Sequence, residues 1–112
     1  MMKMYAIIDD CNYVLALTNT LGDIMEAQND VSHYFSDDDD DLYGSGTSET
    51  AYICEVYITS KFDEIQALYR QGYEELPTMP AMCYKKLYEL EPVLEEDENE
   101  NMICQGFEIY NV

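Results

Sequence analysis

Positive charge is the scarcest property of this sequence. Lys and Arg together number 5 against 24 Asp and Glu, which gives a net charge of −19 at pH 7. A chain this anionic is repelled by phosphate backbones and by anionic lipid surfaces, so we expect no direct binding to DNA, RNA or membranes. Solubility requires a net charge of only about 2–8 in magnitude for a small domain. The surplus therefore points to a partner with a basic surface.

Long apolar runs are also missing. No segment approaches the roughly 18 consecutive apolar residues of a membrane-spanning helix. The opening MMKMYAIIDD has one Lys, a short apolar run and two aspartates, unlike a secretory signal peptide. No CxxC pair occurs among the 4 cysteines, which predicts free thiols in a reducing compartment. We therefore expect a cytoplasmic protein.

Catalytic and metal-binding signatures are absent as well. The sequence has no GxSxG, HExxH, Walker or GxGxxG pattern and a single histidine, His33. Asp37, Asp39 and Asp41 have the spacing of the first ligands of a calcium loop. The Gly and Glu that such a loop requires further along are missing. We predict no enzyme, no cofactor and no specific metal site. A small enzyme using His33 or the pair Asp9 and Asp10 is the remaining catalytic alternative.

Apolar content is sufficient for one folded domain, predicted to span residues 1–112. Hydrophobic residues make up 47% of the chain and aromatic residues 12%, with eleven Tyr and no Trp. β-Branched and aromatic residues predict strands over 3–9, 12–18, 51–59 and 102–110, with a turn at DDCN between the first two. Gly106 is expected at a bulge. A single helix across 13–35 is the competing prediction for the second segment.

Helical periodicity predicts three helices, over 20–35, 61–71 and 80–90. Thr20 is expected to cap the first, Gly72 to end the second and Pro80 to open the third. Two acidic segments, 36–50 and 91–101, are predicted as flexible loops. The element order β-β-α-β-α-α-β predicts an α+β fold with a largely antiparallel sheet and helices packed on one face.

The acidic residues are the predicted partner-binding set. Asp23, Glu26 and Asp30 are spaced to share one stripe of the first helix. The full set comprises this stripe, the first acidic loop with an anchoring Tyr, and the second acidic run; its members are Asp23, Glu26, Asp30, Asp37, Asp38, Asp39, Asp40, Asp41, Tyr43, Glu95, Glu96, Asp97 and Glu98.

The net charge is comparable to that of a DNA segment of similar size. Duplex DNA carries one charge per about 1.7 Å, so 19 charges correspond to about 32 Å of duplex. Alternate residues of a strand lie about 6.6 Å apart, and i, i+4 residues of a helix about 6 Å, similar to neighbouring phosphates. Rows of carboxylates on regular elements are therefore expected to pair with the Lys and Arg of a nucleic-acid groove.

In size, charge, the acidic runs SDDDDD and EEDENE, and abundant Tyr, the chain resembles acidic DNA-mimic inhibitors of phages and mobile elements. That resemblance implies an inhibitor, of anti-CRISPR or anti-restriction type, that blocks the basic DNA- or RNA-binding groove of a host defence nuclease. An acidic adaptor domain that binds a basic protein without nucleic-acid mimicry is the alternative.

Overall fold

The fold is mostly β. The computed structural model describes residues 2–31, 50–96, 98–100 and 102–112. Of these, 56% are in strands and 22% in helices. The elements are β1 (Met2–Asp9), β2 (Val14–Thr18), α1 (Leu21–Val31), β3 (Ala51–Ile58), α2 (Phe62–Arg70), β4 (Glu74–Leu76), β5 (Met79–Glu96) and β6 (Met102–Asn111). The predicted α+β class is therefore wrong.

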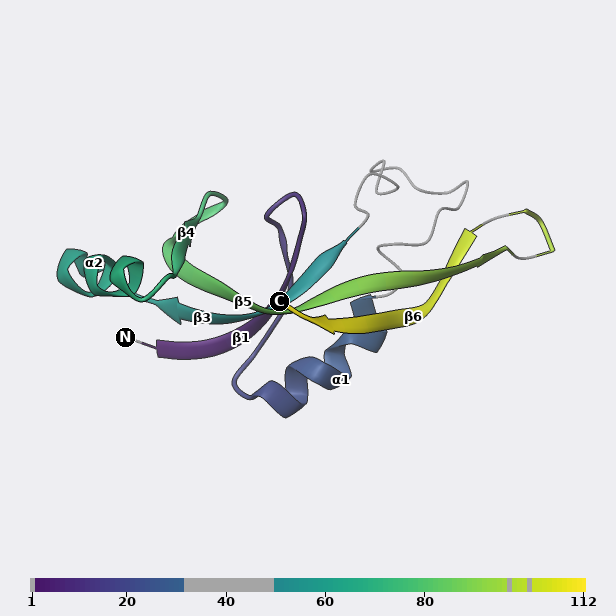
Figure 1. The fold of residues 1–112 in the computed structure, drawn as a ribbon, viewed down its shortest axis with the longest axis horizontal. Coiled ribbons are helices and arrows are strands. Elements are labelled where there is room, and N and C mark those ends of the chain that lie inside the picture. The colour runs from purple at the N-terminus through teal and green to yellow at the C-terminus, as the bar shows by residue number, and fades with distance from the viewer. Residues whose placement is uncertain (1, 32–49, 97, 101) are drawn as a thin grey trace.

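One curled antiparallel sheet contains all six strands, in the order β2-β1-β3-β5-β4. β6 also pairs with β5, further along the strand than β4 does. β5 is thus the longest strand: its first half pairs with β3 and β4, and its second half pairs with β6 (Figure 1). The molecule is elongated, with extents of 54 × 26 × 20 Å.

The strands predicted from β-forming residues are confirmed. β1 and β2 form the expected hairpin, and Asn12 in its turn has a positive φ of 67°. The alternative of one helix across 13–35 is wrong, because β2 occupies its start. The predicted bulge is also present: Val93 pairs with Gly106 but Leu94 pairs with Cys104, which leaves one extra residue on β6.

The predicted helix over 80–90 is wrong, and so is the predicted loop over 91–101. Both fall largely within β5, which continues to Glu96 and is followed by a turn. Met82, Cys83 and Tyr84 are all buried, because this part of β5 lies inside the sheet with both faces covered. Pro92, expected to end a helix, pairs with Phe107 of β6. It is tolerated because β3 ends opposite Leu90, so no strand of the described chain needs an N–H on that side.

The two helices do not form a layer on one face of the sheet. α1 starts as predicted, with the Thr20 hydroxyl accepting from the Asp23 amide at 3.1 Å, and it packs on β1 and β2. α2 lies at the far end of the molecule, beyond β3 (Figure 1). Its Leu68 packs with Tyr73 and Cys83 in a separate small cluster. The sheet curls into a half-barrel, and of the two helices only α1 packs in its main core.

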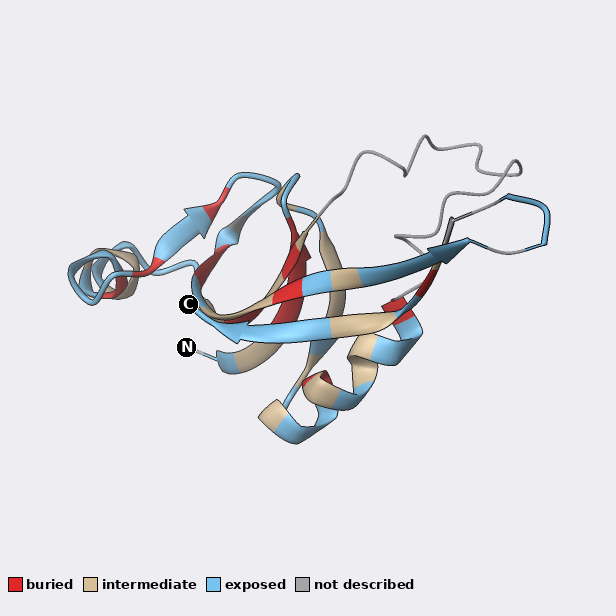
Figure 2. Ribbon diagram, turned by 45° about the vertical axis from the view of Figure 1, so that its right-hand side comes forward, coloured by how far each residue is buried: buried red, intermediate tan, exposed pale blue. Residues whose placement is uncertain are grey.

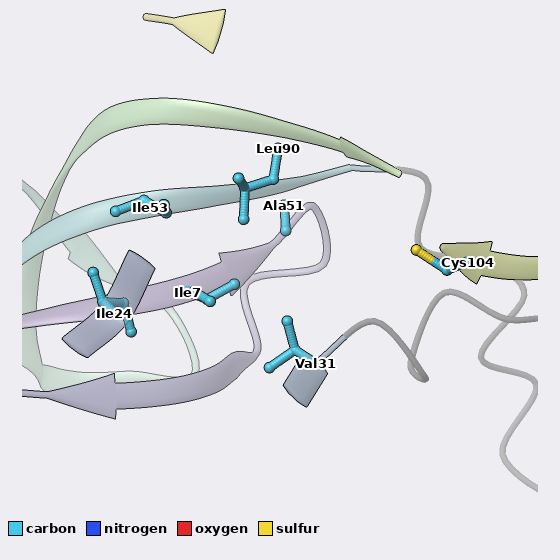
Figure 3. Packing of buried hydrophobic residues seen from close by; sticks show 7 residues of the cluster. All are labelled: Ile7, Ile24, Val31, Ala51, Ile53, Leu90 and Cys104. Carbon is cyan, nitrogen blue, oxygen red and sulfur yellow. The ribbon is translucent and has the colours of Figure 1, made fainter. Parts of the chain in front are cut away.

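The main core lies between α1 and the sheet. Ile24 and Val31 of α1 face Ile7 of β1, Ile53 of β3 and Leu90 of β5 (Figure 3). Figure 2 shows the buried positions gathered on the inner strands, while the last parts of β5 and of β6 are exposed. The opposite side of the sheet holds a second buried cluster, which includes Ala6, Ile8, Cys54, Val56, Leu76, Met82 and Tyr84. Above it the Thr78 hydroxyl donates to the Asn12 carbonyl at 2.5 Å, which joins the β4–β5 and β1–β2 turns.

Candidate functional site

All positive side chains lie at the end of the molecule that carries α2. The residues are Lys3 on β1, Lys61 directly before α2, Arg70 at the end of α2, and Lys85 and Lys86 in the first half of β5. The same end carries Glu55, Asp63, Glu64, Glu74 and Glu75, together with Asp9 and Asp10, which line a pocket with Lys86. Lys3 lies 3.5 Å from Glu55, and Lys61 lies 4.0 Å from Glu64. This end therefore has seven carboxylates against five basic residues, and because the two signs nearly balance we call it the balanced end.

The opposite end carries carboxylates without a basic residue. Because the sequence has only 5 Lys and Arg, and the α2 end holds all of them, none remains for α1, the second half of β5 or β6. The described carboxylates of these elements and of the turn after β5 are Asp23, Glu26, Asp30, Glu89, Glu91, Glu95, Glu96, Glu98, Glu100 and Glu108. The charge surplus is thus segregated along the long axis of the molecule (Figure 1).

A compact part of this surplus lies on the face of β5 and β6 that points away from α1. Leu90 and Phe107 pack toward α1, so the alternating neighbours Glu89, Glu91 and Glu108 point the other way. Glu91 is directly opposite Glu108, and Glu89 is directly opposite Tyr110. We call Glu89, Glu91, Glu108 and Tyr110 the outer-face patch.

Tyr110 interacts electrostatically with the three carboxylates of the outer-face patch. Its hydroxyl donates to a Glu108 carboxylate oxygen, and the ring is 45% exposed. That hydrogen bond, with the negative charges of Glu108, Glu91 and Glu89, raises the pKa of Tyr110. The tyrosine therefore stays neutral at physiological pH and presents an apolar ring among three carboxylates.

The predicted binding residues fall into separate groups. Asp23, Glu26 and Asp30 are exposed along α1, as their spacing predicts. Glu95 and Glu96 are exposed on β5 instead of in a loop, and Glu98 is exposed in the turn that follows. Asp37, Asp38, Asp39, Asp40, Asp41, Tyr43 and Asp97 lie outside the described residues. α1 covers one face of the sheet, and the outer-face patch occupies the other. The acidic stripe of α1 and the outer-face patch therefore point to opposite sides of the molecule.

Sequence reasoning missed the outer-face patch. The sequence pattern that could have revealed the patch is the alternation of Tyr88, Glu89, Leu90 and Glu91, which has the two-residue period of a half-exposed strand. Interpreting 80–90 as a helix and 91–101 as a loop divided that alternation between two elements. Glu108 and Tyr110 were placed correctly on a strand, but without the partner strand their carboxylate neighbours were not evident.

The catalytic alternative at Asp9 and Asp10 has only a small cavity. Its volume is about 90 Å³, well below the roughly 300–1,000 Å³ of ordinary small-molecule sites. The Asp9 carboxylate accepts from the amides of Cys11 and Tyr13, at 2.9 and 2.8 Å, and thereby holds the β1–β2 turn. Burial raises the pKa of the lining Cys54 thiol to about 12, which leaves it unreactive. The other proposed catalytic residue, His33, lies outside the described residues.

The same turn holds a cluster of side chains that could bind a metal ion. Ligand atoms of Asp9, Asp10 and Cys11 come within 4.8 Å of one another, the one such group among the residues that the structure describes. Asp9 already serves the turn, and the other two residues are exposed. All four cysteines are present as thiols, and those of Cys54, Cys83 and Cys104 are buried.

No helix of the described chain is both long enough and apolar enough to span a membrane. Comparisons with protein-family models, with curated proteins and with solved structures find no match to this chain.

Proposed function

We propose that this protein is a nucleic-acid mimic that inhibits a host defence nuclease, foremost a CRISPR effector, by occupying its basic DNA- or RNA-binding groove. The observation that carries the proposal is the segregation of charge: one end of the molecule holds all five basic residues with seven carboxylates, and the other carries ten described carboxylates and no base. A merely soluble surface intersperses both signs. Segregation instead creates a single strongly negative end suited to a positive groove.

The charge density of the acidic end is of the right order for mimicry. Half of the 54 Å long axis corresponds to about 16 phosphates of duplex DNA, at one charge per about 1.7 Å. The ten described carboxylates reach more than half of that density. A groove that holds phosphates with Lys and Arg would therefore meet a comparable number of anionic partners. Binding of this protein would require neither strand separation nor base pairing.

The outer-face patch supplies the most ordered part of such a surface. Glu89 and Glu91 are two residues apart on one strand, and Glu108 is opposite Glu91. Like charges directly opposite each other destabilise a sheet. Their placement is understandable if a partner's arginines bridge them, because guanidinium groups bind carboxylates through two parallel hydrogen bonds and stack on aromatic rings such as Tyr110.

This mode of action requires no catalysis by the inhibitor, no cofactor and no metal. Inhibition would be stoichiometric, and association would be fast at low salt and strongly reduced by added salt. It would take place in the cytoplasm, where the target nuclease acts on nucleic acid.

The test is inhibition of a panel of RNA-guided and restriction nucleases by the parent and by two matched variants. The first variant combines Glu89→Gln, Glu91→Gln and Glu108→Gln. The control combines Asp63→Asn, Glu74→Gln and Glu75→Gln, which removes the same number of charges from the balanced end. We expect at least tenfold weaker inhibition by the first variant and less than twofold change in the control.

Competition distinguishes mimicry from the acidic-adaptor alternative. Excess guide RNA or target DNA should displace the protein from its nuclease. Binding should also weaken as NaCl is raised from 50 to 500 mM, because the Debye length falls from about 14 Å to about 4 Å and charged contacts are screened. A partner that is bound at the acidic end but not released by nucleic acid would refute mimicry and favour the adaptor function.

A further inference from the structure

α2 buries little of its surface against the rest of the molecule. It lies at the end of the molecule, beyond β3 (Figure 1). Leu68 is its buried residue and packs against Tyr73 and Cys83. Ile65 packs partly against the same cluster. Most of the remaining helix surface faces solvent, so the side chains on that surface are not dictated by the core.

Apolar side chains nevertheless continue onto the exposed side of α2. Phe62 is 70% exposed and Tyr69 is 41% exposed. With Ile65 they are spaced i, i+3 and i+7, so the three side chains form one stripe along the helix. Met2, which is 58% exposed, opens β1 opposite Ile58, where β3 ends and the chain continues into α2. Single exposed apolar side chains are ordinary, but an apolar stripe on an exposed helix indicates a contact face.

The charged residues beside this stripe are ordered by sign. Asp63 is exposed in the first turn of α2, and Arg70 is exposed in the last turn. Seven residues, or about two turns, separate them, so they share one side of the helix. In two antiparallel helices the first turn of one lies beside the last turn of the other. Asp63 of each copy would therefore meet Arg70 of the other copy.

We propose that α2 is a docking surface for a second copy of this chain. The two α2 helices pair in antiparallel orientation about a twofold axis, with Phe62, Ile65 and Tyr69 at the centre and Asp63–Arg70 ion pairs at the sides. The contact is small, because nine helical residues span only about 14 Å, so we expect a dimer that dissociates on dilution. This surface does not depend on the proposed mimicry, which uses the other end of the molecule.

The distribution of charge favours a second copy as the occupant. The acidic end, with ten described carboxylates and no base, repels another molecule of this protein. The balanced end carries α2 and has seven carboxylates against five bases, so two copies repel each other least there. A basic partner is drawn to the acidic end instead, and an acidic partner is attracted to neither end. The antiparallel dimer leaves both acidic ends pointing outward and free to enter a groove (Figure 1).

The experiment is sedimentation equilibrium of the full chain from about 5 to about 500 μM at a constant 150 mM NaCl. The apparent mass of the parent should rise from 13.0 kDa towards twice that value. Phe62→Ser, Arg70→Asp and Asp63→Arg should each weaken the dimer at least tenfold. Tyr13→Ser, which removes a ring that is 60% exposed in the β1–β2 turn, should change the dissociation constant less than twofold.

A mixture of the two charge-reversed variants tests the antiparallel geometry. Arg70→Asp places two acidic residues on α2, and Asp63→Arg places two basic residues there, so each variant alone repels itself. Mixed one to one, they should regain association to within threefold of the parent, because each Asp then faces an Arg.

Three results would overturn the assignment. They are a constant mass of 13.0 kDa over the whole concentration range, equal weakening by Tyr13→Ser and Phe62→Ser, and no regained association in the mixture. Unchanged circular dichroism of Phe62→Ser, whose side chain is mostly exposed, shows that the fold is intact. Nuclease inhibition by Phe62→Ser should equal that of the parent, so failure of dimerisation and failure of mimicry are read separately.

Discussion

The repulsion between Glu91 and Glu108 gives the sharpest test of the outer-face patch. Replacing Glu91 by Gln removes one of two like charges directly opposite each other on β5 and β6, and nearly preserves side-chain shape. If the patch is maintained for binding at the expense of stability, this change should stabilise the free protein while weakening inhibition. A residue that serves the fold would behave in the opposite way.

The size of the expected stabilisation follows from the distances between the carboxylates of the patch. Directly opposite side chains are roughly 5 Å apart, so two unit charges in water repel by about 0.8 kcal/mol. Glu89, about 6.8 Å away along the strand, adds about 0.6 kcal/mol. Screening and side-chain freedom reduce the total, so we expect Glu91→Gln to raise the free energy of unfolding by about 1 kcal/mol at 10 mM NaCl. This corresponds to an increase in Tm of roughly 4 °C.

The assay is urea denaturation at 10 mM and 1 M NaCl. The gain should nearly vanish at 1 M, where the Debye length is only about 3 Å. A double-mutant cycle with Glu108→Gln should show non-additivity of about 0.8 kcal/mol, because either change alone removes the pair repulsion. Destabilisation by Glu91→Gln, or a gain that is equal at both salt concentrations, would refute the electrostatic account of the patch.

Four further substitutions test the fold and the pKa of one tyrosine. Leu90→Ala, in the core beneath α1, should lower the free energy of unfolding by about 2–5 kcal/mol in urea denaturation. Gly106→Ala should destabilise the protein by about 1–3 kcal/mol, because the φ of Gly106 is 151°. Gly22→Ala in α1 should instead stabilise it by about 0.5–1 kcal/mol. Neither new methyl group meets an atom within 4 Å, so equal effects of the two substitutions would contradict the backbone explanation. The hydrogen bond to Glu75 raises the pKa of Tyr69 to about 12, so its stabilising effect should be complete below pH 10 and lost as the pH rises toward 12. Glu75→Gln should lower that pKa in an ultraviolet titration, and an unchanged pKa would exclude Glu75 as its cause.

The elements that sequence reasoning predicted correctly depend on local signals. β-Formers flanked by turn residues define β1, β2 and β3, and a glycine at the bulge marks β6. The start of α1 at a threonine cap is likewise a local feature. Each of these is set by residues within one segment, so knowledge of the rest of the fold was not required.

β5 was missed because its neighbours determine its form. The segment around Met82 to Tyr84 is buried on both faces, so it is apolar without alternation and fits a helical period as well as a strand. Pro80 and Pro92 seemed to mark helix boundaries, yet Pro92 lies beyond the end of β3, where its missing N–H has no consequence. Only the lengths of β3, β4 and β6 decide whether a proline is tolerated in β5, and these lengths are properties of the assembled sheet.

The same strand explains why composition alone could not locate the site. β5 carries Lys85 and Lys86 in its first half and Glu89, Glu91 and Glu95 in its second half, so one continuous strand connects the balanced end to the acidic end. Eighteen residues of extended chain span about 60 Å, comparable to the 54 Å length of the molecule. A field directed along the long axis orients the protein before contact. We therefore expect it to enter a basic groove with the β5–β6 end first, which leaves α2 outside the groove in the complex.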